Sequence, residues 1–183
     1  MVDDGGGAQI LTVGHSTHPI EEFIELLGEA GVTRIVDIRK LPGSRRFPQF
    51  DADALADSLR GAGIAYEREE RLGGLRKSTA EVDPGVNAFW RNASFHRYAD
   101  YATTGEFHSG LQRLLQLTST DGLSALMCAE AVWWRCHRRI VADHLIAHGV
   151  EVGHLMPDGR CSRAELTAGA RIGAGATVRY PAD

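Results

Sequence analysis

Residues 10–31 read ILTVGHSTHPIEEFIELLGEAG, and this stretch decides the expected fold. The apolar run at residues 10–13 ends at Gly14, which is typical of a short buried strand. From Pro19 onward the apolar residues recur every three or four positions, as on one face of a helix, until Gly31 ends the pattern. The stretch therefore predicts a buried strand followed directly by an amphipathic helix.

The same alternation of strand and helix continues along the chain. Further β-type runs are found at residues 34–38, 64–67, 123–127 and 150–154. Helical spacing is found at residues 51–62, where Asp51 is expected to cap the helix, and at 95–102, 107–115 and 140–147. Strands separated by helices favour a parallel sheet covered on both faces. We expect an α/β fold, a three-layer Rossmann-like sandwich whose mainly parallel sheet has about five strands.

The expected domain organisation is simple, because the chain contains no Pro/Ser-rich linker and no internal repeat. Residues 9–156 are predicted to form a single α/β domain. Residues 1–8 are rich in Gly and Asp and are predicted to be a flexible tail, and residues 157–183 a C-terminal extension. The connection at residues 70–92 is long, and connections of this length are usually functional or mobile.

Composition limits the class of protein. The 183 residues carry 20 Lys and Arg against 24 Asp and Glu, so the net charge of −4 excludes a uniformly basic surface. No apolar run approaches the roughly 20 residues of a membrane span, and the first residues do not resemble a signal peptide. Three cysteines are too few for a disulfide scaffold, and their odd number suits a reducing compartment. We expect a cytoplasmic protein that does not bind a membrane.

Reactive side chains follow three of the predicted strands. The first strand is followed by His15 and Ser16, the second by Arg39, and the fourth by Cys128 and Glu130. Ligands of open α/β sheets bind beyond the carboxyl ends of the strands. We therefore expect these segments, although far apart in sequence, to surround one cavity.

Basic residues are concentrated in two of these segments. Residues 34–46 contain five basic side chains and one acid, and residues 135–139 contain three arginines and no acid. Guanidinium groups match phosphate and carboxylate oxygens, and a helix beginning near Cys136 adds its positive end. We predict an anion-binding pocket; the alternative is that these arginines are solvated or paired elsewhere. The expected ligand-binding residues are Gly14, Ser16, Asp37, Arg39, Arg45, Arg46, Cys136, His137 and Arg138.

The segment at residues 128–138, CAEAVWWRCHR, allows three interpretations. Cys128 can be a nucleophile whose pKa is lowered by nearby arginines, although the glycines of a phosphate-wrapping loop are absent. Cys128, Cys136 and His137 can be metal ligands, although their spacing matches no usual zinc pattern. Alternatively, both cysteines are small buried residues that shape the pocket while Glu130 and its neighbours hold the ligand.

Histidines and carboxylates supply the acid and base candidates. His15 follows a strand and can serve as acid or base near pH 7, or can only hold the turn through a backbone carbonyl. Glu130 is the second candidate, and Asp37 is expected to orient Arg39 or His15. The histidines at positions 96, 108, 144 and 148 are expected on the surfaces of helices.

Aromatic residues lie between the basic ones. Trp133 and Trp134 can stack on a base if exposed, or fill space under the next helix if buried, and residues 87–98 mix aromatic and basic groups in the same way. Nucleic acid is therefore a conceivable partner, although the net negative charge argues against it. The sequence identifies no cofactor and does not determine the oligomeric state.

Several motifs occur together in a characteristic order. They are Thr12-Val13-Gly14-His15-Ser16, Val36-Asp37-Ile38-Arg39, Pro42-Gly43-Ser44-Arg45-Arg46, Leu72-Gly73-Gly74, Met127-Cys128-Ala129-Glu130 and Cys136-His137-Arg138. Over about residues 9–155 the chain resembles the bacterial and archaeal family called domain of unknown function 488 (DUF488). The resemblance implies that the motif residues belong to one site, but it implies no activity. Residues 131–135 are bulkier than in other members, which implies a distinct ligand preference.

These observations lead to one main hypothesis and two alternatives. The main hypothesis is an enzyme, a hydrolase or transferase, that acts on a phosphate-bearing or nucleic-acid-derived substrate. His15, Glu130 and Cys128 are its catalytic candidates. The first alternative is a non-catalytic module that senses an anionic small molecule or binds nucleic acid. The second is a metal-binding protein that uses Cys128, Cys136 and His137.

Overall fold

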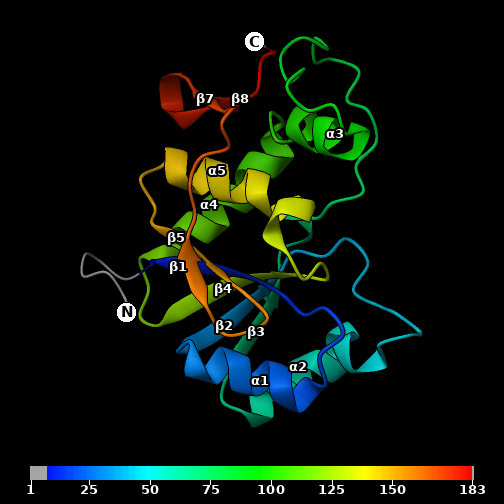
Figure 1. The fold of residues 1–183 in the computed structure, drawn as a ribbon, viewed down its shortest axis with the longest axis vertical. Helices are drawn as coiled ribbons and strands as arrows, with labels where there is room; N and C mark the ends of the chain where they lie inside the picture. Colours follow the sequence, from blue (N-terminus) through cyan, green and yellow to red (C-terminus); the bar gives the residue numbers. More distant parts are fainter. Residues whose placement is uncertain (1–7, 183) are drawn as a thin grey trace.

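A computed structural model describes residues 8–182. In this range the main sheet has six strands in the order β3-β2-β4-β1-β5-β6, and five of them run parallel (Figure 1). The sixth, β6, pairs antiparallel with β5 at the edge. The strands are β1 (Ile10–Gly14), β2 (Val32–Asp37), β3 (Ala65–Arg68), β4 (Leu123–Cys128), β5 (Val152–Leu155) and β6 (Cys161–Arg163).

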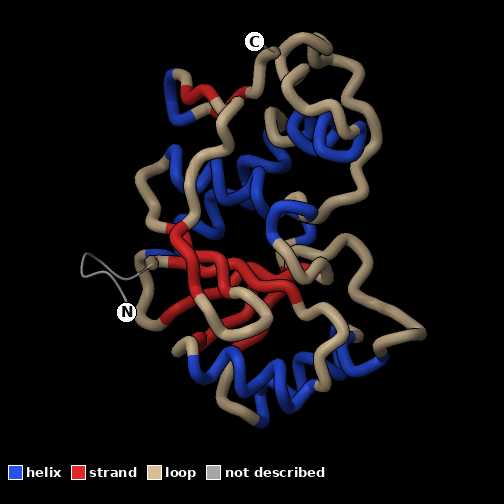
Figure 2. Tube along the Cα trace, in the orientation of Figure 1, coloured by secondary structure: helices blue, strands red, loops and turns tan. Residues whose placement is uncertain are grey.

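Helices cover both faces of the sheet (Figures 1 and 2). Helices α1 (Ile20–Glu29) and α2 (Ala52–Gly61) lie on one face. Helices α4 (Gly105–Thr118) and α5 (Arg138–Ala147) lie on the other, together with α3 (Ala93–Tyr101). The predicted α/β class and three-layer architecture are therefore confirmed.

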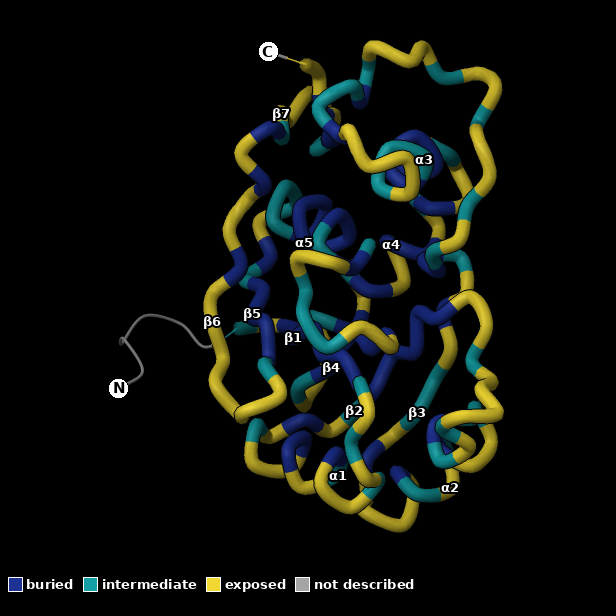
Figure 3. Tube along the Cα trace, turned by 45° about the vertical axis from the view of Figure 1, so that its right-hand side comes forward, coloured by how far each residue is buried: buried dark blue, intermediate teal, exposed yellow. Residues whose placement is uncertain are grey.

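The apolar run of β1 shows why this order of elements forms. Ile10 belongs to the core cluster beneath α4 and α5, whereas Leu11 and Val13 belong to the cluster beneath α1 and α2. Side chains of a strand alternate between faces, so a strand covered on both faces is mostly apolar, and the one polar side chain of β1, Thr12, is hydrogen-bonded to His154 Nδ1 at 2.7 Å. Each fully buried side chain of this kind contributes about 1.5–3 kcal/mol. Burial is concentrated in the central strands, whereas the surface loops are exposed (Figure 3).

Two local expectations are wrong. Asp51 occupies the N-cap position of α2, but its Oδ1 accepts a hydrogen bond from the Ser44 backbone N–H at 2.8 Å and does not cap the helix. His144 was expected at a helix surface, yet it is buried against Phe107, because α4 packs on that side of α5. In both cases a residue from outside the local segment decides the environment.

The two ends of the chain differ in what the structure describes of them. Residues 1–7 of the predicted flexible tail lie outside the described residues. Within residues 157–182 the chain adds β6 to the sheet and forms a small hairpin of β7 (Arg171–Ile172) and β8 (Val178–Arg179). Tyr180 is fully buried in the core against Trp90. Among the described helices, none is long and apolar enough to cross a lipid bilayer.

The long connection after β3 is anchored at several points. It begins with a 3₁₀ turn at Glu70–Leu72, and the Tyr98 hydroxyl donates to the Leu72 carbonyl at 2.6 Å. Further along, the buried Asn87 amide donates to Asp100 at 2.8 Å and its oxygen accepts from the Tyr180 backbone N–H at 3.1 Å. These bonds tie the connection to α3 and to the C-terminal segment.

Candidate functional site

The carboxyl ends of three neighbouring strands meet at one edge of the sheet. β4 lies between β1 and β2, with Gly14 opposite Cys128 and Asp37 opposite Met127. A Cβ atom at Gly14 would clash with the Glu130 carbonyl, so only glycine allows this close approach. The segments that follow these strands are therefore neighbours, although about 90 residues of sequence separate β2 from the end of β4.

A cavity of about 500 Å³ opens beside these strand ends. This volume lies within the usual range of small-molecule sites. Its walls come from residues 39–41 and 74–76, from the first part of α3, and from residues 128–137. A second hollow of about 570 Å³ lies against the β7–β8 hairpin, but its described lining includes none of the motif residues. The cavity at the strand ends is therefore the candidate site.

The lining of this cavity is strongly basic. Glu130 is the one carboxylate among the described lining residues. The basic lining residues are Arg39, Lys40, Arg76, Arg97 and Arg135. Several guanidinium and ammonium groups around a partly enclosed space concentrate a positive potential there.

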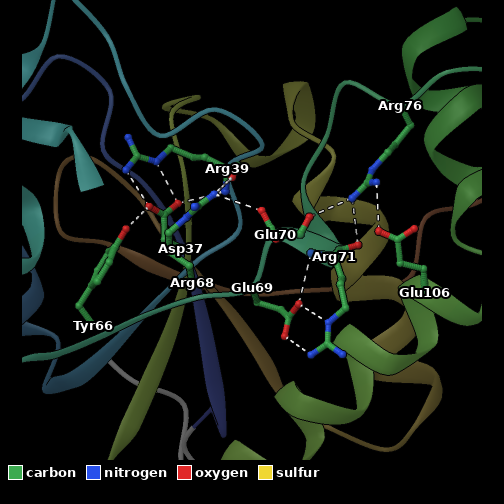
Figure 4. Close-up of polar contacts among 9 residues, drawn as sticks. All are labelled: Asp37, Arg39, Tyr66, Arg68, Glu69, Glu70, Arg71, Arg76 and Glu106. Atoms are coloured by element: carbon green, nitrogen blue, oxygen red, sulfur yellow. Dashed lines mark hydrogen bonds and ion pairs between the residues drawn. The ribbon is translucent and has the colours of Figure 1, made fainter. Parts of the chain in front are cut away.

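One wall is built on the buried carboxylate of Asp37 (Figure 4). Arg39 donates from Nε to Oδ1 at 2.9 Å and from Nη2 to Oδ2 at 2.7 Å, and the Tyr66 hydroxyl donates to Oδ2 at 2.6 Å. Asp37 is 0% exposed, so its charge is compensated entirely inside the protein. These bonds to Asp37 fix the orientation of the Arg39 guanidinium, and Arg39 is one of the residues that line the cavity.

His15 extends the same wall. Its Nε2 lies 3.3 Å from Arg39 Nη1 and its Nδ1 lies 2.9 Å from the Ser16 carbonyl, so the tautomer protonated at Nδ1 satisfies both contacts. The ring also stacks on Phe50 with centroids 4.0 Å apart. Burial, reinforced by the charge of Arg39, lowers the pKa of His15 to about 4. His15 is therefore neutral at pH 7. We call Asp37, Arg39, Tyr66 and His15 the Asp37 network.

Arg138 performs a similar structural task behind the cavity. Its side chain is 1% exposed. Nη1 donates to the Glu130 carbonyl at 2.6 Å and Nη2 donates to the Ala131 carbonyl at 3.1 Å. The guanidinium thereby holds the loop that follows β4, which positions the Glu130 backbone.

The opposite wall contains a cluster of sulfur and imidazole groups. Cys128 ends β4 and Cys136 precedes α5, and their Sγ atoms are 2.9 Å apart. His137 Nδ1 lies 3.6 Å from the sulfur of Cys136, and its Nε2 is buried without a hydrogen-bond partner among the described residues. The donor atoms of these three residues lie within 4.8 Å of one another, so they are also the described residues best placed to hold a metal ion. We call Cys128, Cys136 and His137 the cysteine cluster.

The two thiols of this cluster have different environments. Burial raises the pKa of Cys128 well above its usual value. Burial acts in the same sense on Cys136, but a hydrogen bond shared with Cys128 and the neighbouring His137 and Arg138 outweigh it and hold the pKa of Cys136 well below its usual value. Of the two thiols, Cys136 is therefore the more acidic.

A glycine pair brings the long connection against both walls. A Cβ atom at Gly73 would lie 3.1 Å from Lys40 Cα, and one at Gly74 would lie 3.0 Å from His137 Nδ1. Contacts this close leave no room for a larger side chain without displacing the neighbour. The motif Leu72-Gly73-Gly74 thus closes the cavity between the basic loop and the cysteine cluster.

Comparison with known proteins identifies the family of this chain. The model of a family described as domain of unknown function DUF488 matches residues 19–145, which is more than half of the chain. The chain belongs to the DUF488 family. No curated protein and no solved structure matches it.

In this DUF488 protein the predicted site residues fall into three groups. Arg39, Cys128, Glu130, Cys136 and His137 line the cavity. The next group supports its walls from behind or forms the adjacent turn: Gly14, His15, Ser16, Asp37 and Arg138. Arg45 and Arg46 are exposed on the loop after β2 and are absent from the described lining.

Four basic lining residues of the DUF488 chain are not among the predicted ligand-binding residues. Lys40 and Arg135 belong to the two basic segments, Arg76 lies in the long connection at residues 70–92, and Arg97 lies in the mixed aromatic and basic segment. Their signal was therefore present in the sequence. It could not be separated from that of their neighbours, because charge counting does not reveal which side chains face a cavity.

The two adjacent tryptophans differ in environment. Trp133 is half-buried and stacks on His154 with centroids 4.4 Å apart, so it fills space beneath α5. Trp134 is 45% exposed. Of the two alternatives for this pair, packing applies to Trp133, while Trp134 presents its ring to solvent.

Proposed function

We propose that the cavity binds a phosphate-bearing molecule or a similar small anion, such as a nucleotide or another component of nucleic acid. The observation that carries this proposal is the lining, in which five basic side chains surround one carboxylate. Basic groups in a partly enclosed site attract anions and bind phosphate oxygens through charge-assisted hydrogen bonds.

The ligand contacts are assigned to the basic groups whose donors remain available. Lys40 and Arg135 are exposed, and no ion pair joins either side chain to the rest of the described chain. Arg97 uses Nε to bind the Arg76 carbonyl at 3.2 Å, which leaves its terminal nitrogens available. Arg39 and the buried Arg138 contribute positive charge, but most of their donors are already used.

The enzymatic form of the proposal places the reacting groups around this anion. Glu130 faces the cavity and is exposed, so it is the acid or base candidate. The cysteine pair supplies the nucleophile, and we assign that role to Cys136, whose pKa is the lower of the two. Both ring nitrogens of His15 are in contact with neighbours, so we assign it a positioning role through Arg39. The reaction class is hydrolysis or group transfer in a reducing compartment such as the cytoplasm.

Calorimetric titration with inorganic phosphate, pyrophosphate and a nucleoside monophosphate tests this proposal. Lys40→Met and Arg135→Met remove exposed cations and should leave folding intact. Losing a charged hydrogen bond of about 1.5–3 kcal/mol predicts an affinity roughly tenfold or more lower for either variant. Arg45→Met is the matched control, because Arg45 is equally basic but absent from the described lining, and its affinity should not change. No binding of any of these anions, or equal affinity in all variants, would refute the anion site.

Nucleic-acid binding is the second candidate, and the exposed ring of Trp134 beside Arg135 is the observation that favours it. A single-stranded oligonucleotide titrated at several salt concentrations distinguishes the two. Binding that weakens steeply with salt and falls on Trp134→Ala, without binding of mononucleotides, favours nucleic acid. Binding of mononucleotides that is unaffected by Trp134→Ala favours the small anion.

A further inference from the structure

Cys128 and Cys136 are placed closer together than two independent thiols need to be. Their sulfur atoms are 2.9 Å apart, about 1 Å beyond the roughly 2.05 Å of a disulfide bond. One thiol ends a strand and the other lies in the short turn before α5, so a small rotation of either side chain can close the gap. The fold thus holds the two thiols ready to be joined.

The surroundings favour negative charge on one of the two sulfurs. Arg138 Nη1 lies 3.7 Å from Cys128 Sγ and His137 Nδ1 lies 3.6 Å from Cys136 Sγ. Cys136 also precedes the N-terminus of the ten-residue helix α5, where the helix dipole favours an anion. Arg138 favours negative charge on Cys128, whereas His137 and the start of α5 favour it on Cys136; we assign Cys136 as the nucleophilic member because it alone lies at the helix N-terminus.

Both thiols can be reached by a small molecule. Each residue is only 3% exposed, yet both line the cavity of about 500 Å³. The third cysteine, Cys161, is exposed on the edge strand β6 and belongs neither to the Asp37 network nor to the cysteine cluster. It provides an internal comparison within the same chain.

We propose that Cys128 and Cys136 are a redox-active pair that reduces hydroperoxides and cycles between dithiol and disulfide. The Cys136 thiolate attacks the terminal peroxide oxygen, the O–O bond breaks, and the departing alkoxide takes a proton from solvent, which leaves Cys136 sulfenic acid. The Cys128 thiol then attacks that sulfur, the S–O bond breaks, and water leaves as the disulfide forms. The two sulfurs together lose two electrons, which the peroxide gains. A small dithiol restores the pair by exchange.

A metal ion at the same cluster is the rival occupant, and the geometry favours the redox pair. Two thiolates bound about 2.3 Å from a tetrahedral zinc ion stand roughly 3.8 Å apart, so these sulfurs would have to separate. A dication would also enter a site that already has Arg138 beside it and five basic side chains around the cavity. These charges favour a thiolate but oppose a further cation.

Thiol counting on the full chain tests the proposal directly. The Cys161→Ser protein is reduced, freed of reductant without oxygen in the presence of a chelator, and exposed to one equivalent of hydrogen peroxide. After an acid quench it is alkylated in denaturant, so that burial hides no thiol. We expect two alkylated cysteines before peroxide and none after it, with restoration by dithiothreitol, and peptide mapping should locate the bond between Cys128 and Cys136.

Single variants separate the two roles. In Cys128→Ser the reaction should stop at sulfenic acid on Cys136, which dimedone labels. In Cys136→Ser, Cys128 should react no faster than an ordinary buried thiol. In the wild-type chain, peroxide should consume the pair about tenfold faster than Cys161, because the thiolate is the reactive form.

Three results would overturn the proposal. The first is two free thiols after peroxide treatment, which needs no variant to interpret. The second is sulfenic acid trapped on Cys128 instead of Cys136. The third is one equivalent of zinc in protein purified without chelator, lost together with folding when either cysteine is replaced. None of these readouts depends on phosphate binding, so failure here leaves the anion site standing and the reverse also holds.

Discussion

The two walls of the cavity differ in how fully their charged and polar groups are paired. In the Asp37 network the described charges are paired, with Asp37 accepting from both Arg39 and Tyr66. In the cysteine cluster, the two sulfurs lie 2.9 Å apart, and His137 Nε2 has no hydrogen-bond partner among the residues that the structure describes. A satisfied buried network fixes one geometry, whereas an unsatisfied one is where a structure retains reactivity. The first wall therefore supports the site and the second is available for chemistry.

The basic residues of the site also divide into paired and available groups. Arg39 and Arg138 are both buried, and both donate hydrogen bonds to groups of the protein itself. Lys40 and Arg135, their direct or near neighbours in sequence, remain exposed in the cavity. A basic motif can therefore contain a structural cation beside a ligand-binding one, and experiments can separate the two.

The largest effect is expected at Asp37. Replacement of Asp37 with Asn leaves the buried guanidinium of Arg39 without its counter-charge, and removing one member of a buried pair costs about 3 kcal/mol or more. Urea denaturation should show this loss in the free energy of unfolding. The double variant Asp37→Asn with Arg39→Met should recover part of it. A loss below about 1 kcal/mol for the single variant would contradict the assigned role of the network.

The next effect is the pH dependence of stability. The pKa of His15 is about 4 in the folded protein, below the unfolded value of about 6.5, so the unfolded chain binds the proton first as the pH falls. The contribution of His15 to the free energy of unfolding is therefore complete above pH 6.5. It is lost between pH 6.5 and 4, at no more than about 1.4 kcal/mol per pH unit. Urea denaturation from pH 7 to 4.5 should show a steeper decline for wild type than for His15→Asn. Equal slopes would contradict the burial of a neutral His15.

A smaller effect is expected on the opposite wall. Gly74→Ala places a methyl group 3.0 Å from His137 Nδ1, and overpacking of this kind costs about 1 kcal/mol or somewhat more. The shifted imidazole should also change the rate at which Cys136 is alkylated. Gly28→Ala in α1 is the control, because its Cβ meets no atom of the described chain within 4 Å and alanine favours the helix. An unchanged alkylation rate in Gly74→Ala would show that His137 does not influence the thiolate.

The smallest effect is expected at Arg45, on the loop after β2. Arg45 is exposed, so Arg45→Met should change the free energy of unfolding by less than about 0.5 kcal/mol. Chemical denaturation measures this directly. A larger loss would mean that the loop supports the Asp37 network and that Arg45 has a structural role.

Much of this architecture could be predicted from local patterns. The run at residues 10–13 is buried on both faces of the sheet, and the helix predicted after Pro19 runs from Ile20 to Glu29. Because parallel strands place their carboxyl ends at one edge, the meeting of the segments after β1, β2 and β4 was also predictable. The role of Asp51 was not, because its oxygen binds Ser44 across a loop whose path no local pattern describes.

The sequence by itself determined the alternation of strands and helices and the segments that reach the site, since hydrophobic periodicity and strand direction are properties of neighbouring residues. Only the tertiary structure decided which basic side chains keep their donors available at the cavity, which one binds Asp37, and which of the two neighbouring thiols has the lower pKa. Those outcomes depend on burial and on charges a few ångströms away that belong to distant parts of the chain. The free energy of a charged group is set by what surrounds it in space, and that arrangement does not exist until the chain has folded.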